Sequence, residues 1–150
     1  MAEIRQATAA DRDALTRLLG EQLGEHQIDT PAAEIGAAVD GILRDPERGR
    51  LLVATVGGRP VGVAALAFVG SIEHGGRSAW LEELYVEPSH RGHGIGRALL
   101  RAACDVAAAA GAAAIDLEVD AGHRRAERLY EAEGFRPLAR ARWVRRLTPG

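Results

Sequence analysis

Three glycines, Gly92, Gly94 and Gly96, alternate with other residues in the stretch RGHGIG. The stretch follows an apolar segment with the pattern of a strand and precedes a run with helical spacing. A helix that begins at such a point has amide donors without intrahelical partners and carries partial positive charge there. Because glycine has no side chain, a bulky anion can approach these donors. The stretch therefore predicts a phosphate-binding loop, and a loop that only turns the chain is the alternative.

Two familiar phosphate-binding loops do not fit the stretch. A P-loop ends in Gly-Lys-Ser/Thr, and this chain contains no lysine. The dinucleotide fingerprint Gly-x-Gly-x-x-Gly fails in both registers, since its third glycine would fall at Arg97 or at Leu99. A nucleotide-dependent oxidoreductase is therefore disfavoured.

Size, charge and cysteine content narrow the class of protein. A length of 150 residues predicts one domain, 1–150, that is large enough to bury a core. The formal charge of −2 supplies no basic field, so we expect no nucleic-acid partner. The single cysteine, Cys104, excludes an internal disulfide and is typical of a reducing compartment. A charged N-terminus and an alanine-rich run too short to span a bilayer predict a cytoplasmic protein without a membrane partner.

Hydrophobic periodicity predicts alternating strands and helices in one mixed α/β domain. The expected strands are 3–8, 50–56, 60–69, 79–86, 113–119 and one or two within 135–147. The expected helices are 9–23, 31–43, a long helix from about residue 94, and 123–134. No cluster of histidine, cysteine and carboxylate side chains has metal-ligand spacing, so we expect no metal.

Three features together resemble the GNAT superfamily of N-acetyltransferases. RGHGIG is similar to Arg/Gln-x-x-Gly-x-Gly/Ala, the loop that binds the pyrophosphate of acetyl-CoA in that family. ERLYEAEGF is similar to its second signature, and the order of elements is similar across nearly the whole chain. The resemblance implies a mixed, mostly antiparallel sheet of about six to seven strands, flanked by about four helices. Splayed strands in that fold form the acetyl-CoA cleft.

The resemblance also implies which residues hold acetyl-CoA as co-substrate. Backbone amides of the loop would bind the pyrophosphate. These loop residues are Arg91, Gly92, His93, Gly94, Ile95, Gly96 and Arg97. The strand before the loop normally bulges and splays from its neighbour, so that the backbone of Leu84, Tyr85 and Val86 pairs with the pantetheine arm as an added strand. A backbone amide there would stabilise the oxyanion.

Amine acetylation needs a base, because an alkyl ammonium has a pKa of roughly 10 and must lose a proton before it attacks. Glu82 and Glu83 are the candidates, and strand alternation places them on opposite faces. The segment WLEELYV is similar to the branch of the family that acetylates small polyamines and related amines. By that resemblance Glu82 is the preferred base and Glu83 a contact for a cationic substrate. A water molecule in place of both is also left open.

The second signature implies a proton donor for the leaving thiolate. Tyr130 matches the family tyrosine whose hydroxyl lies near the sulfur. Seven residues earlier, where the family often has an asparagine that contacts the cofactor, this chain has His123. Histidine can replace that hydrogen bond, or it can be a plain helix-start residue.

These features predict an acetyl-CoA-dependent N-acetyltransferase that acts on a primary amine of a small molecule, whether polyamine-like, amino-acid-like or an aminated metabolite. A non-catalytic acyl-CoA sensor on the same scaffold is the alternative. The terminal segment ARARWVRRL has a predicted strand edge and an apolar Trp143, which together predict a homodimer.

Overall fold

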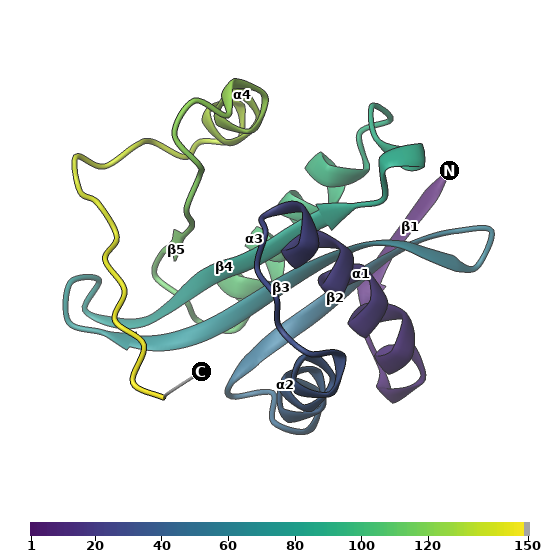
Figure 1. The fold of residues 1–150 in the computed structure, drawn as a ribbon. Helices are drawn as coiled ribbons and strands as arrows, with labels where there is room; N and C mark the ends of the chain where they lie inside the picture. The colour runs from purple at the N-terminus through teal and green to yellow at the C-terminus, as the bar shows by residue number, and fades with distance from the viewer. Residues whose placement is uncertain (149–150) are drawn as a thin grey trace. The chain divides into compact units, whose positions relative to one another are not determined.

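The computed structural model describes residues 1–148 in two compact units, Met1–Glu118 and the chain from Val119 onward, each considered by itself. The first unit is built on a five-stranded sheet in the order β1-β2-β3-β4-β5 (Figure 1). The strands are β1 (Ala2–Gln6), β2 (Gly49–Val56), β3 (Arg59–Ser71), β4 (Gly76–Val86) and β5 (Ile115–Asp116). Neighbouring strands are antiparallel except β4 and β5, which run parallel. The mixed, mostly antiparallel sheet predicted from the resemblance is confirmed.

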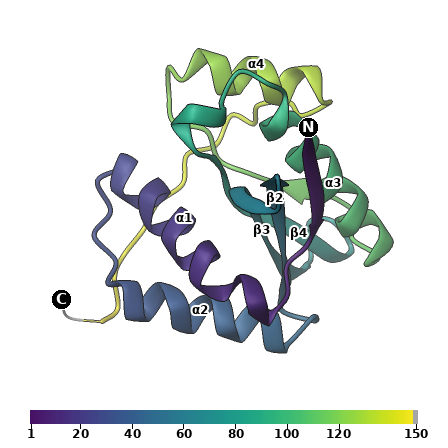
Figure 2. The same cartoon turned by 90° about the vertical axis from the view of Figure 1, so that its right-hand side faces the viewer.

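Helices cover both faces of this sheet, with α1 and α2 on one side and α3 on the other (Figure 2). The helices of the first unit are α1 (Arg12–Glu25), α2 (Ala32–Arg44) and α3 (Ile95–Ala109), with short 3-10 turns η1 (Ala9–Asp11) and η2 (Pro88–His90). The second unit contains α4 (Arg124–Ala132). Within residues 1–148 we find no helix with the length and hydrophobicity that a membrane span requires.

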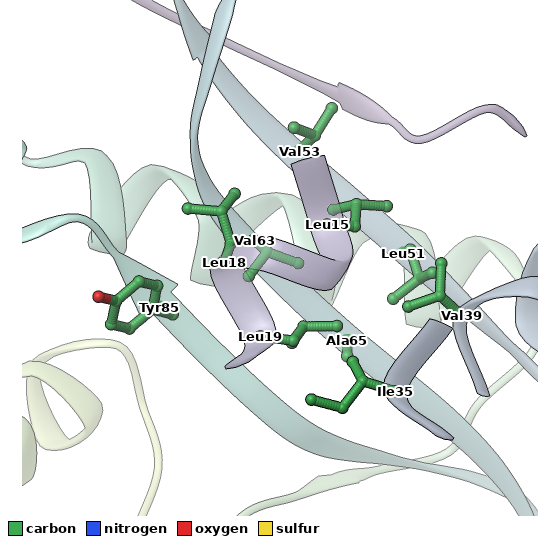
Figure 3. Close-up of a cluster of buried hydrophobic side chains, with 10 residues drawn as sticks. All are labelled: Leu15, Leu18, Leu19, Ile35, Val39, Leu51, Val53, Val63, Ala65 and Tyr85. Atoms are coloured by element: carbon green, nitrogen blue, oxygen red, sulfur yellow. The ribbon is translucent and has the colours of Figure 1, made fainter. Parts of the chain in front are cut away.

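The core under α1 follows from the helical spacing of its leucines. Leu15 and Leu18 are 0% exposed, and both pack in a cluster with Val63 of β3 and Tyr85 of β4 (Figure 3). Each fully buried leucine contributes about 2 kcal/mol to folding. The last turn of α1 is thereby held above the end of β4.

A β-bulge interrupts β4 at Glu82. Ala65 of β3 pairs with Glu83, while the next residue, Leu66, pairs with Leu81, so that Glu82 is the extra residue. In an unbroken strand Leu81 and Glu83 would share a face, whereas the bulge puts them on opposite faces. Leu81 is buried with Leu66, and Glu83 lies on the side of Ala65, which α1 and α2 cover. The bulge implied by the resemblance is present.

The outer edge of β4 is paired over a short stretch only. β5 pairs with β4 at Ala79 and Trp80, and the Ala79 amide donates to the carbonyl of Ala114 at 2.9 Å. From Leu81 to Val86 this edge has no strand partner among residues 1–148. The carbonyls of Leu84 and Val86 on this edge accept side-chain hydrogen bonds from Gln22 and Arg91, and the amides of the same two residues point toward a ligand that would pair with the edge.

Two sequence predictions about strands are wrong. The strand expected over 113–119 is only the two-residue β5, and the part of the chain described from 135 to 148 contains no strand. The sheet consequently has five strands instead of six to seven. Alternation alone did not produce a terminal strand, because a strand also needs a neighbour for its backbone groups and a core for its apolar face. Trp143 and Val144 are 90% and 88% exposed.

Candidate functional site

The glycine loop leads into the N-terminus of α3, as the sequence predicts. Gly92 has a φ of +83° and Gly94, the N-cap residue of α3, has a φ of +80°. Side chains rarely adopt this left-handed conformation, so both turns require glycine. A Cβ atom built at either position would meet nothing within 4 Å, which leaves the space above the loop open.

The first turn of α3 can accept an anion. The first α-helical hydrogen bond is donated by the Ala98 amide to the carbonyl of Gly94 at 3.0 Å. The amides of Ile95 and Gly96 precede that bond, so the helix itself provides no acceptor for them. Arg97, the next residue of this turn, is exposed. Gly96 does not need its conformational freedom, and a Cβ there would lie 3.9 Å from Val86. His93 is exposed within the loop.

Arg91, predicted to contact the cofactor, directs its side chain toward β4 and α1. Its Nε donates to the carbonyl of Val86 at 2.8 Å, and its guanidinium binds Glu25 at 2.9 Å. The same group lies 5.3 Å from the centre of the Tyr85 ring. The side chain of Arg91 therefore ties the start of the loop to both elements. Only the backbone of Arg91 remains to contact a ligand at the loop.

Of the three predicted pantetheine contacts, Leu84 and Val86 face the open edge and Tyr85 does not. The Glu87 amide donates to Val61 of β3, so alternate residues of β4, including Tyr85, point their backbone groups toward β3. The Tyr85 hydroxyl lies 3.2 and 3.1 Å from carboxylate oxygens of Glu21 and Glu25, which share its one proton. Burial, and then these carboxylates, raise the pKa of Tyr85 to about 12.

A residue that sequence analysis missed also contacts the open edge. Gln22 of α1 donates through Nε2 to the carbonyl of Leu84 at 3.2 Å and is 8% exposed. Gln22 follows Leu15, Leu18 and Leu19 on the buried face of the helix. A polar residue at an apolar position of the helical pattern was the available signal.

The two candidate bases have different surroundings. Glu82, in the bulge, is exposed, whereas Glu83 is half-buried. Burial raises the pKa of Glu83 to about 7, and the neighbouring charges of Glu82 and Glu118 act in the same direction. The charge of His26, at the end of α1, acts in the opposite direction. A carboxylate with this pKa can take up and release a proton near neutral pH.

An ion-pair network fixes the chain just after β4. Glu87 is 6% exposed and accepts hydrogen bonds from Arg59 at 2.9 and 3.0 Å and from Arg17 at 3.0 Å. Burial alone would raise the pKa of Glu87, but these two guanidinium groups hold it below its usual range. A groove of about 630 Å³ opens beside this network, lined by the last turns of α1, Arg59, Tyr85 and residues 87–89. The network therefore braces the segment that leads from β4 into the glycine loop.

In the second unit, α4 carries Tyr130 and has His123 as its N-cap residue. The ring of Tyr130 makes an edge contact with Phe135, with 5.8 Å between ring centres. Burial raises the pKa of its hydroxyl, which stays protonated at neutral pH. His123 accepts the Ala126 amide through Nδ1 at 3.2 Å and so caps the helix. This contact supports the helix-start interpretation of His123.

Comparisons with known proteins agree with these features. A model of the acetyltransferase (GNAT) family matches residues 12–135. The chain is 33% identical to an aminoalkylphosphonate N-acetyltransferase of Salmonella typhimurium, over 89% of this chain and 84% of the relative. It superposes on a candidate acetyltransferase from Arthrobacter sp. FB24 with a TM-score of 0.82 and 33% identity, covering 97% and 96% of the two chains. The structure of a candidate acetyltransferase with acetyl-CoA from Clostridium acetobutylicum superposes with a TM-score of 0.80 at 21% identity, covering 97% and 96%, and shares the fold.

Proposed function

Because this chain belongs to the acetyltransferase (GNAT) family and is an acyltransferase, we propose that it transfers the acetyl group of acetyl-CoA to a primary amine of a small molecule by direct attack. The observation that carries this proposal is the position of Glu83. This half-buried carboxylate immediately precedes Leu84, whose backbone faces the unpaired edge of β4. A base and a backbone donor are thus one residue apart.

The residues of the first unit fit acetyl-CoA as co-substrate. The open space above Gly92 and Gly94 and the amides at the start of α3 suit a diphosphate. The Leu84 amide points the same way as the Leu84 carbonyl, toward the open edge, where it can stabilise an oxyanion. When bound, the cofactor supplies an acetyl thioester, which is activated toward amines.

Glu83 is the base in this proposal, in preference to the exposed Glu82 that the resemblance favoured. A general base works best when its pKa lies near the operating pH. Burial brings the pKa of Glu83 to about 7, so it can accept a proton from an ammonium group near neutral pH. Glu82 lies in solvent and acts through its charge, which raises the pKa of Glu83.

Tyr130 is the proposed proton donor to the leaving thiolate. Its hydroxyl stays protonated at neutral pH because burial raises its pKa, and its ring is held by Phe135. The family resemblance of the segment around Tyr130 supports this role. A proton held on a fixed hydroxyl can be donated without waiting for solvent.

The test is thiol release from acetyl-CoA over a panel of amines: 2-aminoethylphosphonate, lysine, spermidine and an aminoglycoside. We expect acetylation of at least one member, a loss of about 10²-fold or more in kcat/KM for Glu83→Gln, and a smaller loss for Tyr130→Phe. CoA binding by calorimetry should be unchanged in both variants. Tight CoA binding with no turnover of any amine would instead support the non-catalytic sensor.

Assembly and compartment remain predictions. Residues 135–148 contain no strand, so the homodimer prediction now rests on the exposed Trp143. A cytoplasmic location is proposed from the single cysteine.

A further inference from the structure

Gln22 has a buried oxygen without a hydrogen-bond partner. The residue is 8% exposed, and its Oε1 is buried with no partner among residues 1–148. The orientation of the amide is fixed, because the carbonyl of Leu84 can only accept and therefore takes the Nε2 donor at 3.2 Å. Buried acceptors in proteins nearly always have a donor. The missing donor is consequently expected on a ligand.

The position of this oxygen is set by the last turns of α1. Gln22 lies one helical turn before His26 on the same face of the helix. Gln22 contacts Leu84, and the charge of His26 acts on Glu83, the residue before it. This face of α1 therefore lies over the base and the open edge of β4.

A reacting amine fits the missing donor better than the cofactor does. The glycine loop leads into α3, which packs on the sheet face opposite α1. An arm of the cofactor that pairs along β4 would use backbone groups in the plane of the sheet, whereas Gln22 reaches the carbonyl of Leu84 from α1, which covers one face of the sheet. The free oxygen of Gln22 is thus left for a donor that approaches from the α1 side.

We propose that Oε1 of Gln22 accepts an N–H of the attacking amine and selects primary over N-methylated amines. This inference rests on the proposed function. A primary ammonium has three hydrogens. As the C–N bond forms and the C–S bond breaks, one proton goes to Glu83 and on to solvent, and a second replaces the proton that Tyr130 gives to the thiolate. The third stays on the amide nitrogen of the product, and this is the hydrogen that Gln22 holds. A secondary amine ends without any hydrogen on nitrogen and loses this contact.

The experiment compares kcat/KM for 2-aminoethylphosphonate, or the best amine of the panel, with that for its N-methyl counterpart. We expect the wild type to prefer the primary amine, and Gln22→Met to reduce this preference about three- to tenfold. Gln22→Leu removes the same amide with a second apolar side chain of similar size; it should reduce the preference in the same way and serves if the methionine variant folds poorly. Gln6→Met, at an exposed glutamine of β1, is the matched control and should change nothing.

Three outcomes would overturn the inference. An unchanged preference in Gln22→Met would show that Gln22 only caps the carbonyl of Leu84. A weaker affinity for CoA with the same preference would put its oxygen on the cofactor. If the wild type acetylates no amine of the panel although it binds CoA, the proposed function fails and this inference fails with it.

Discussion

Replacing Glu83 by glutamine should make the protein less active and more stable. The pKa of Glu83 is raised from 4.5 to about 7, chiefly by burial. Between these pH values the folded protein keeps a proton that the unfolded chain has released, so the free energy of unfolding falls as pH rises through this window. Glu83→Gln carries no charge and escapes that loss.

The size of the gain follows from the shift. One pKa unit corresponds to 1.36 kcal/mol, so the rise to about 7 amounts to about 3 kcal/mol without screening. Because the carboxylate is only half-buried, solvent screens it, and we expect about 1–2 kcal/mol at pH 8. At pH 5 most of the gain should be absent.

Urea unfolding at pH 5 and pH 8 measures the gain, and the pH profile of kcat/KM measures the base. The wild-type profile should have an apparent pKa near 7. Glu82→Gln is the matched control: it removes the exposed neighbouring charge, so it should move the profile to lower pH and keep activity. If Glu83→Gln gains no more stability at pH 8 than at pH 5, or keeps full kcat/KM, then Glu83 is not the perturbed base.

Three further outcomes are expected. Gly94→Ala, at a φ of +80°, should cost about 1–2 kcal/mol of stability and weaken CoA binding measured by calorimetry. The control Gly75→Ala, at a φ of +75° in the turn between β3 and β4, should cost the same stability and leave CoA binding intact. Equal effects of the two substitutions on CoA binding would contradict a binding role for the loop. Glu87→Gln should lower the free energy of unfolding by about 1–3 kcal/mol at pH 7. Since the folded pKa of Glu87 is depressed, this difference between wild type and variant should shrink as pH falls below 4.5. A difference in unfolding free energy that persists in acid would exclude the ion pairs as its cause. Trp143→Ser should shift a homodimer to monomer in light scattering, and a wild type that is already monomeric refutes the dimer.

The helices and the glycine loop could be predicted because their signals are local. The spacing of Leu15 and Leu18 defines the buried face of α1 within a few residues of sequence. Gly92 and Gly94 adopt conformations that glycine favours by its own stereochemistry. Neither signal depends on what the segment packs against.

The missed features depend on partners distant in the sequence. β5 is two residues long, and its pairing with Ala79 and Trp80 of β4 joins segments more than 30 residues apart in the sequence. Gln22 is buried because it reaches the carbonyl of Leu84, 62 residues away, which a helical pattern cannot show. Pattern reasoning therefore overstated the strands and overlooked the polar contact.

The two adjacent glutamates show why register decides chemistry here. Glu82 and Glu83 are the same residue type in the same strand, and resemblance alone favoured Glu82. The bulge places Glu82 in solvent and turns Glu83 toward the face covered by α1. A slip of one residue would exchange their surroundings and would also turn the backbone of Leu84 away from the open edge. The bulge in β4 therefore positions both the base, Glu83, and the backbone donor, Leu84. A change of register would remove both groups from the site, whereas a substitution of Glu83 would remove the base alone.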